Sequence, residues 1–388
     1  MAGRNVVVCC DGTANEFAEN RTNVIKLYSV LDHDPTKQIA YYHPGLGTME
    51  PAGALTNFSR KVTKLFGQAI GYGLSNDIRD AYVFLMQEFR DNDQLFLFGF
   101  SRGAYTARAL AALLHMYGLI RPGNEALVPY AIRMMMGINR AKDNKDEKDK
   151  YFALASEFKS TMCSVDCKPH FVGVWDTVSS VGWIENPLRL PFTAYNPDIA
   201  IGRHAVAIDE KRAFFRTNLW SPPNSPSSQT DLKQVWFPGV HCDVGGGYAE
   251  AESGLSKLAL DWMLQEAKNA GLFVLPEKEQ EVLGVTTTTK FVRPNPNACA
   301  HESLKGAWNI AEFIPKRHYN WKKKCEERRM NRYRRRTIPA GSLVHESVFE
   351  RQGNYAKRVP SDAVRVSTLP SSPVGRLGAA NSASGGSQ

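Results

Sequence analysis

The chain has 388 residues, of which 43% are hydrophobic and 22% are charged, and its formal net charge is +9. This content is ample for a large core, built as one elaborated α/β domain or as two smaller ones. No apolar run approaches the roughly 18 residues of a membrane-spanning helix, and the N-terminus lacks the features of a secretory signal peptide. We therefore expect a protein that is cytoplasmic, or exported without a cleavable signal peptide, and at most peripheral at membranes.

The seven cysteines are odd in number and scattered, which favours a reducing compartment in which thiols act as small core residues. Cys163, Cys167 and His170 come nearest to a zinc motif. No second pair of ligands follows them at the spacing of a zinc finger. We therefore expect neither a metal nor a cofactor.

The first predicted strand covers residues 5–10 and is followed by Asp11, Gly12 and Thr13. This position is informative because α/β sheets place their ligand sites at the carboxyl ends of strands. The next expected elements are a helix over 23–31, a strand over 38–43 and a helix that Ser75 caps.

A G-x-S-x-G turn centred on Ser101 follows a strand predicted over 94–98 and precedes an Ala- and Leu-rich helix predicted over 104–114. Strand, tight turn and helix around a serine are the context that a nucleophile elbow requires. We expect Ser101 at positive φ, with glycine at Gly99 and Gly103 because side chains there would collide. The alternative is a glycine-rich turn without chemistry.

Residues 120–165 are predicted to form a helical insertion over the carboxyl edge of the sheet. Its methionines Met134, Met135 and Met136 either line an acyl pocket or, as is more common, belong to the ordinary core.

Two later strands end in residues suited to assist the serine. The strand predicted over 170–175 is followed by Asp176, and the strand over 234–238 leads to His241 in a glycine-rich loop. The order Ser, Asp, His matches that of α/β-hydrolases. Between these strands, residues 202–209 are predicted to form a helix.

The expected mechanism assigns one role to each residue. His241 takes the proton of Ser101 as the hydroxyl attacks an ester carbonyl, and Asp176 orients the imidazole. The backbone N–H of Arg102 is the first expected oxyanion donor, and Gly12 or Thr13 is the second. His345 is the main rival of His241 as general base, and Asp243 and Asp11 are candidates for supporting the site. We expect Asp11 to order its loop rather than to contact a metal.

The net charge is concentrated between Lys316 and Arg336, where eleven Lys and Arg residues stand against two Glu. Aromatic residues are interleaved with this basic stretch. Such a pattern suits an anionic membrane surface, and it also occurs in solvated segments that serve only solubility. We do not expect nucleic acid as the partner.

Residues 342–351 are expected to add a last strand or helix, and residues 361–388, rich in Ser, Gly, Ala and Pro, to form a disordered tail. The predicted organisation is a catalytic domain over 1–315, a basic extension over 316–360 and this tail. The predicted fold is a mostly parallel, α/β-hydrolase-like sheet flanked by helices.

Four segments together resemble the α/β-hydrolase family, long described as a domain of unknown function, that includes phospholipase effectors of type VI secretion systems. The resemblance covers about residues 5–270 and implies serine-ester hydrolysis, with phospholipase activity for some members. The segments that carry it are Val8-Cys9-Cys10-Asp11-Gly12-Thr13, Gly99-Phe100-Ser101-Arg102-Gly103-Ala104-Tyr105-Thr106-Ala107-Arg108, Gly173-Val174-Trp175-Asp176-Thr177-Val178 and Phe237-Pro238-Gly239-Val240-His241-Cys242-Asp243-Val244-Gly245-Gly246-Gly247-Tyr248.

Two other functions remain open at this point. A strand that ends in Asp-Gly-Thr is also compatible with a phosphatase that uses Asp11 as nucleophile, although Thr13 stands where a second acid is usual. The other alternative is a vestigial hydrolase that binds membrane or nucleic acid through its basic stretch.

Overall fold

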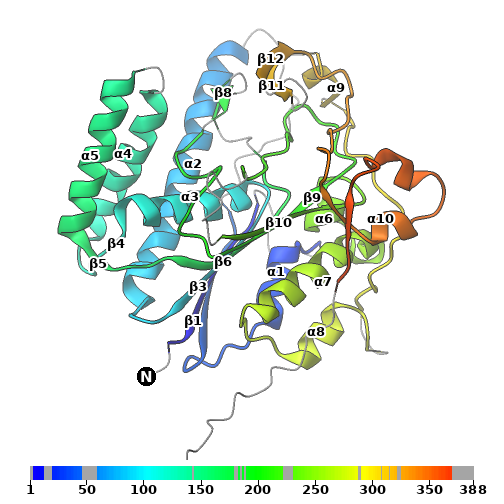
Figure 1. The fold of residues 1–388 in the computed structure, drawn as a ribbon, viewed down its shortest axis with the longest axis horizontal. Helices are drawn as coiled ribbons and strands as arrows, with labels where there is room; N and C mark the ends of the chain where they lie inside the picture. Colours follow the sequence, from blue (N-terminus) through cyan, green and yellow to red (C-terminus); the bar gives the residue numbers. More distant parts are fainter. Residues whose placement is uncertain are drawn as a thin grey trace, which may run out of the picture.

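The computed structural model describes residues 3–12, 20–45, 59–141, 144–178, 182–183, 186–187, 189–221, 230–286, 290–306, 308–313, 315–320 and 325–368. Its centre is an eight-stranded sheet in the order β14-β13-β10-β9-β6-β3-β1-β2, in which all of the described pairings are parallel (Figure 1). The strands are β1 (Asn5–Cys10), β2 (Gln38–His43), β3 (Gln94–Phe100), β6 (Pro169–Trp175), β9 (Ile201–Ala207), β10 (Asp231–Phe237), β13 (Leu343–His345) and β14 (Val364–Val366).

Helices cover both faces of this sheet, as Figure 1 shows. One face carries α2 (Ser59–Glu88), α3 (Arg102–Tyr117), α4 (Val128–Arg140) and α5 (Lys145–Met162). The other face carries α1 (Asn23–Val30), α6 (His241–Gly245), α7 (Gly254–Asn269) and α8 (Pro276–Val282). Smaller elements are the helices α9 (Trp308–Ala311) and α10 (Ser347–Glu350) and the strand pairs β4 (Leu119–Ile120) with β5 (Cys163–Val165), β7 (Gly182–Trp183) with β8 (Asn186–Pro187), and β11 (Lys316–Asn320) with β12 (Cys325–Arg329).

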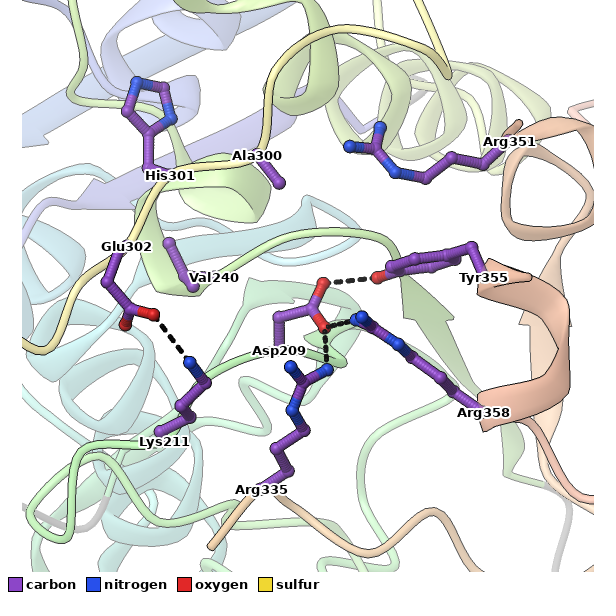
Figure 2. Close-up of a pocket in the computed structure, with 10 residues that line it drawn as sticks. All are labelled: Asp209, Lys211, Val240, Ala300, His301, Glu302, Arg335, Arg351, Tyr355 and Arg358. Carbon is purple, nitrogen blue, oxygen red and sulfur yellow. Dashed lines mark hydrogen bonds and ion pairs between the residues drawn. The ribbon is translucent and has the colours of Figure 1, made fainter. Parts of the chain in front are cut away.

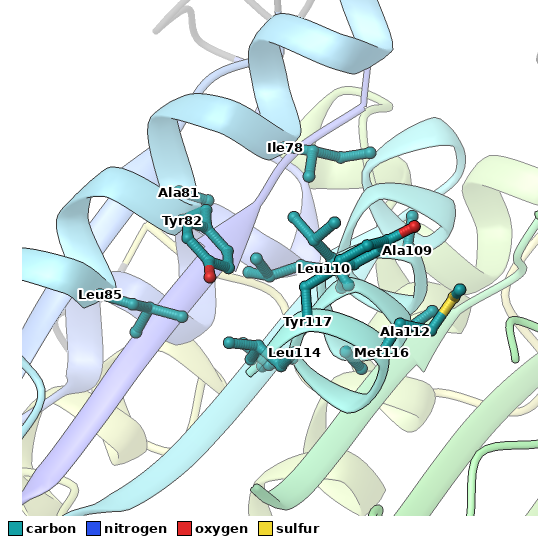
Figure 3. Packing of buried hydrophobic residues seen from close by; sticks show 14 of the residues in the cluster. Ile78, Ala81, Tyr82, Leu85, Ala109, Leu110, Ala112, Leu114, Met116 and Tyr117 are labelled. Carbon is teal, nitrogen blue, oxygen red and sulfur yellow. The ribbon is translucent and has the colours of Figure 1, made fainter. Parts of the chain in front are cut away.

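The central strands are apolar on both faces because both faces are covered. Along β1, Val6 and Val8 face the core under α2 and α3, whereas Val7 and Cys9 face the core under α1 and α7. Figure 3 shows the first of these cores where α2 packs on α3. Burying each large apolar side chain there contributes about 1.5–3 kcal/mol.

The strand order reverses at β1. The chain passes from β1 to β2 on one side and then places β3 on the other side of β1. In open α/β sheets, the crevice outside the carboxyl ends of strands at such a reversal is where ligands bind. The residues that follow β1 and β3 therefore occupy the expected ligand site.

Several predicted elements are confirmed, and others are wrong. Residues 202–209 were expected to be helical, but residues 201–207 form β9, buried between β6 and β10. A short apolar run does not distinguish a buried strand from a buried helix. Ser75 lies inside α2, which begins at Ser59, and so does not cap a helix.

The helical insertion predicted over 120–165 is present as α4 and α5. The two helices pack beside α2 and α3 rather than over the carboxyl edge of the sheet (Figure 1). Met134 and Met135 are buried in that core, which makes them ordinary core residues.

Part of the segment after residue 315 belongs to the same sheet. Its strands β13 and β14 extend the sheet beyond β10, and α10 follows β13 as expected for residues 342–351. The boundary at residue 315 is thus a division of the sequence and not of the sheet. Part of the predicted tail was wrong, because Val364 and Val366 pair with β13 as a strand; residues 369–388 lie outside the described residues.

The basic stretch begins with the antiparallel β11–β12 pair, at the top of Figure 1, and then passes through a turn at Arg332 and Tyr333 to reach Arg336. Within the described part of the chain, no helix is both long enough and apolar enough to cross a membrane.

Candidate active site

Ser101 occupies the elbow that the sequence predicts. It follows β3 directly, has φ of 59°, and precedes α3, which begins at Arg102. A Cβ at Gly99 would lie 2.4 Å from the Gly103 carbonyl oxygen, and a Cβ at Gly103 would lie 2.1 Å from that of Cys10. Both glycines are therefore required by the close crossing of β1, β3 and α3, which confirms the steric argument.

Asp176 follows β6, the strand next to β3, and is also in the left-handed region, with φ of 39°. It is 1% exposed. Its N–H donates to the Ala205 carbonyl oxygen at 2.7 Å, and its Oδ1 accepts from the Ala207 N–H at 3.0 Å. The end of β9 thus fixes the orientation of this carboxylate.

His241 is the first residue of α6, beyond β10, and is 3% exposed. Its Nδ1 lies 2.5 Å from Asp176 Oδ2. The imidazole is packed between Phe100 and Phe215, with ring centres 4.6 and 4.8 Å away. Because Phe100 directly precedes Ser101, this packing holds the histidine beside the elbow.

Close packing of α6 on β3 requires a small residue at Gly245. A Cβ at this position would lie 1.9 Å from the Phe100 ring.

Ser101 and His241 both lie within the described part of the chain, and the Ser101 hydroxyl makes no hydrogen bond to His241 there. Such contacts are often long in unliganded enzymes and shorten when substrate binds.

Arg336 is a member of this site that the sequence did not reveal. Its side chain is 5% exposed and forms a bidentate salt bridge with Asp176, in which Nη1 donates to Oδ1 at 2.5 Å and Nη2 donates to Oδ2 at 3.0 Å. It also donates to the carbonyl oxygens of Ala207 and Phe215. The last residue of the basic stretch is therefore buried at the site, which corrects its assignment to a surface patch.

The charges in this cluster set two pKa values. Burial by itself would raise the pKa of Asp176, but Arg336 and His241 outweigh burial and hold that pKa well below its usual range. Burial lowers the pKa of His241, and its contact with Asp176 only partly offsets this effect. The resting pair is therefore a charged carboxylate and a neutral imidazole, the state that a general base requires.

A second ion pair supports the histidine loop. Glu210 Oε2 accepts from the His241 backbone N–H at 3.2 Å, and the same carboxylate pairs with Arg212 at 2.9 Å. The Arg212 guanidinium lies 3.5 Å from the centre of the Phe215 ring and 5.4 Å from that of Trp308. Burial acts to raise the pKa of Glu210, but Arg212 outweighs it and lowers that pKa to about 2.

The predicted oxyanion donors differ in their surroundings. The N–H of Arg102 is in the first turn of α3, where N–H groups have no acceptor within the helix. The N–H of Gly12 donates to Asp11 Oδ1 at 2.7 Å, so it would have to leave Asp11 to bind an oxyanion. Thr13 lies outside the described residues.

The hydrogen bonds of Asp11 are those expected of a residue that orders its loop. Its Oδ2 accepts from the Thr22 hydroxyl at 2.5 Å and from the Tyr42 hydroxyl at 2.8 Å, and it is 2% exposed. A carboxylate engaged by these donors and by Gly12 is poorly suited to attack a phosphate, so the phosphatase alternative gains no support.

His345 lies apart from Asp176. Its ring nitrogens contact the hydroxyls of Ser347 and Thr368, at 2.8 and 2.9 Å, and burial lowers its pKa to about 4. Asp243 does support the loop of His241, because it accepts from the Val240 N–H at 3.0 Å and from His301 Nδ1 at 2.6 Å.

Residues 4–266 match the family described as "T6SS, Phospholipase effector Tle1-like, catalytic domain". The matched region covers well over half of the chain and contains Ser101, Asp176 and His241. It ends before Arg336.

Individual relatives are longer than this chain. The uncharacterized protein YEL023C of Saccharomyces cerevisiae is 35% identical over 230 residues, which are 57% of this chain and 33% of the relative. A crystal structure of an uncharacterized protein from Pseudomonas aeruginosa has a TM-score of 0.39 and 20% identity, and the match covers 71% of this chain and 47% of that one. The Tle1 effector bound to the VgrG spike of the type 6 secretion system has a TM-score of 0.35 and 18% identity, over 66% of this chain and 53% of that one. The chain thus spans about a third to a half of the length of these relatives.

Proposed function

Because the chain belongs to the family of Tle1-like catalytic domains of type VI secretion phospholipase effectors, we propose that it is a serine hydrolase that cleaves carboxylic esters of phospholipids. One observation carries the proposal. The buried contact between His241 and Asp176 lies beside the elbow of Ser101, at the carboxyl ends of strands. This is where a parallel sheet brings together residues that are far apart in sequence.

The proposed reaction has two halves. The Ser101 oxygen attacks the ester carbonyl while His241 Nε2 accepts the hydroxyl proton, and the oxyanion binds the N–H of Arg102. His241 then gives that proton to the departing alcohol, which leaves an acyl group on Ser101. Water, deprotonated by His241, attacks this ester, and His241 returns the proton to the Ser101 oxygen as the fatty acid leaves. Asp176 holds the Nδ1–H and stabilises the imidazolium in both halves.

Arg336 acts as a positioning residue in this scheme. It keeps Asp176 ionised and fixes both carboxylate oxygens, and its charge also offsets part of the attraction between Asp176 and the imidazolium. Its removal should therefore disturb the orientation of the pair and raise the pKa of His241.

We expect Arg336→Gln to lower kcat/KM by a factor of about 10 to 100, which corresponds to the loss of a hydrogen bond to a charged group. The same change should move the acid limb of the pH–rate profile to higher pH. Arg336→Lys should recover part of the rate. Arg203 offers a matched control, because it is equally buried and pairs with Asp231 and Glu266, away from His241. An Arg203→Gln protein with the same pH shift would show that the effect is only structural.

The lowered pKa of His241 predicts the pH dependence of the wild type. Only neutral imidazole accepts a proton, so activity is lost as the pH falls through the pKa of His241. Since burial lowers this pKa, the acid limb of kcat/KM should lie below the ordinary histidine value of about 6.5. A limb at or above pH 7 in a pH–rate profile would contradict this assignment.

The basic stretch supports a membrane as the place of the reaction. Four of its cations lie on the described strands of the β11–β12 pair, namely Lys316, Arg317, Arg328 and Arg329. The segment that follows reaches the carboxyl edge of the sheet, where the proposed site lies. Such a basic strand pair suits an anionic bilayer, at about 1 kcal/mol for each cation near the surface.

The test of the proposed function is a substrate panel. Phosphatidylcholine vesicles, vesicles that also contain phosphatidylglycerol, and a soluble short-chain ester are offered, and fatty acid release is measured by mass spectrometry. We expect release from both vesicles, faster from the anionic ones and slower at high salt. Cleavage of the soluble ester alone would reject phospholipids as substrates, and cleavage of none would reject the hydrolase.

A further inference from the structure

A cationic cavity of about 210 Å³ lies next to the loop that carries His241, and its lining does not include Ser101, Asp176 or His241 (Figure 2). Its lining includes four cationic side chains and two carboxylates, so these ionisable groups sum to two positive charges. The residues on which the argument depends are Asp209, Lys211, Glu302, Arg335, Arg351 and Arg358.

Asp209 is shared between two arginines at the centre of this cavity. Its Oδ1 accepts from Arg335 Nη1 at 3.2 Å and from Arg358 Nη1 at 2.5 Å, while Oδ2 accepts from the Tyr355 hydroxyl and from the Gly239 N–H. In the described part of the chain, neither guanidinium donates to another acceptor. Because a guanidinium has five N–H groups, each arginine retains donors for a further anion. The two side chains are 45% and 41% exposed, so that anion can reach them from solvent.

Arg351 supplies a cation that no carboxylate balances. Its Nη1 is fixed by the carbonyl oxygens of Pro296 and Ala298, and among the described residues it has no acidic partner. Its guanidinium lies 5.2 Å from the centre of the Tyr355 ring, and that of Arg358 lies 4.7 Å away. Figure 2 shows the ends of Arg335 and Arg358 meeting at Asp209, while the end of Arg351 lies apart from them on the other side of Tyr355. Guanidinium groups match the oxygen geometry of a phosphate, which can accept from more than one of them at the same time.

We propose that this cavity binds a phosphate group, carried by a phospholipid headgroup or free in solution, as a site separate from Ser101. Two chain segments connect it to the proposed active site. Arg335 directly precedes Arg336, and Val240, which lines the cavity, directly precedes His241. Asp209 and Gly239 are joined by two hydrogen bonds, from the Asp209 N–H to the Gly239 carbonyl oxygen and from the Gly239 N–H to Asp209 Oδ2, so an occupied cavity braces the loop of the histidine.

The binding test does not depend on hydrolysis and uses the Ser101→Ala protein. Inorganic phosphate is titrated and followed by calorimetry and by Tm, against sodium chloride of the same ionic strength. We expect saturable binding, and Arg351→Gln should weaken it at least about tenfold. Arg365 on β14, exposed and outside the cavity, provides the matched control Arg365→Gln, which should leave binding unchanged. Binding equal to that of chloride, or insensitive to Arg351→Gln, would overturn the proposal.

The source of the phosphate is separated with vesicles. If a lipid headgroup is the ligand, Arg351→Gln should weaken binding to phosphatidic acid vesicles more than Arg365→Gln does. If free phosphate is the ligand, both variants should bind these vesicles equally, while they still differ in the titration with inorganic phosphate. That bracing of the His241 loop affects activity only where the proposed function holds. Failure of the phosphate site and failure of the proposed function can therefore be told apart. A protein that binds phosphate but releases no fatty acid loses only the proposed function, and one that releases fatty acid without binding phosphate loses only this site.

Discussion

Ser101→Ala should lower kcat by a factor of about 10⁴ to 10⁶ and leave the fold intact. The replacement removes the oxygen that would form the acyl-enzyme but keeps the Cβ, so the backbone at φ of 59° carries no new strain. The contact of His241 with Asp176 does not involve this hydroxyl and should persist. The measurement is the rate of fatty acid release, with Tm as the check on folding.

Another serine serves as the control for this experiment. Ser160 lies on the exposed side of α5, where its hydroxyl donates to the Glu157 carbonyl oxygen of its own helix. Ser160→Ala should therefore retain full activity. A Ser101→Ala preparation that keeps more than about a hundredth of the wild-type kcat would show that another group is the nucleophile.

Asp176→Asn has the second largest expected effect, and it acts on both activity and stability. An amide cannot stabilise the imidazolium and favours the wrong tautomer, which costs a factor of about 10⁴ in kcat. The same change leaves Arg336 buried opposite a neutral group. Breaking a buried pair in this way typically costs about 3–5 kcal/mol of unfolding free energy, which Ser101→Ala should not lose.

Denaturant unfolding of single and double variants separates these two effects. Arg336→Gln added to Asp176→Asn should recover part of the stability, because no unpaired charge remains buried, but none of the activity.

The pH dependence of the unfolding free energy has a defined sign. The pKa of Asp176 is lowered in the folded state, so its stabilisation is complete above the unfolded value of about 3.9 and disappears as the pH falls toward the folded value. Asp176→Asn should lack this acid-dependent loss, and a kcat within tenfold of wild type would contradict the assigned role.

The predicted site residues that the fold places at one edge of the sheet are those whose position follows from local rules. Ser101 is identified by the glycines on either side of it, which the crossing of β3 and α3 requires. Asp176 and His241 are identified because each follows an apolar run, and the carboxyl ends of parallel strands lie at one edge of the sheet.

Arg336 could not be predicted in this way. It lies 160 residues from Asp176 in the sequence, among ten other cations, and the sequence does not distinguish the one that returns to the core. The strand β9 was missed for a related reason. Its apolar residues are buried by β6 and β10, and only these pairings, not the run itself, make it a strand. Both errors concern contacts that the fold creates between distant segments.

The central claim is that Ser101 is an activated nucleophile, and covalent labelling with a fluorophosphonate probe tests it most directly. The wild type is labelled beside Ser101→Ala, with and without anionic liposomes, and the adduct is located by mass spectrometry. A single adduct on Ser101 that is absent from the variant is the predicted result. Labelling that persists in Ser101→Ala, or folded wild type that stays unlabelled even with liposomes, would contradict the account and favour a vestigial hydrolase that only binds.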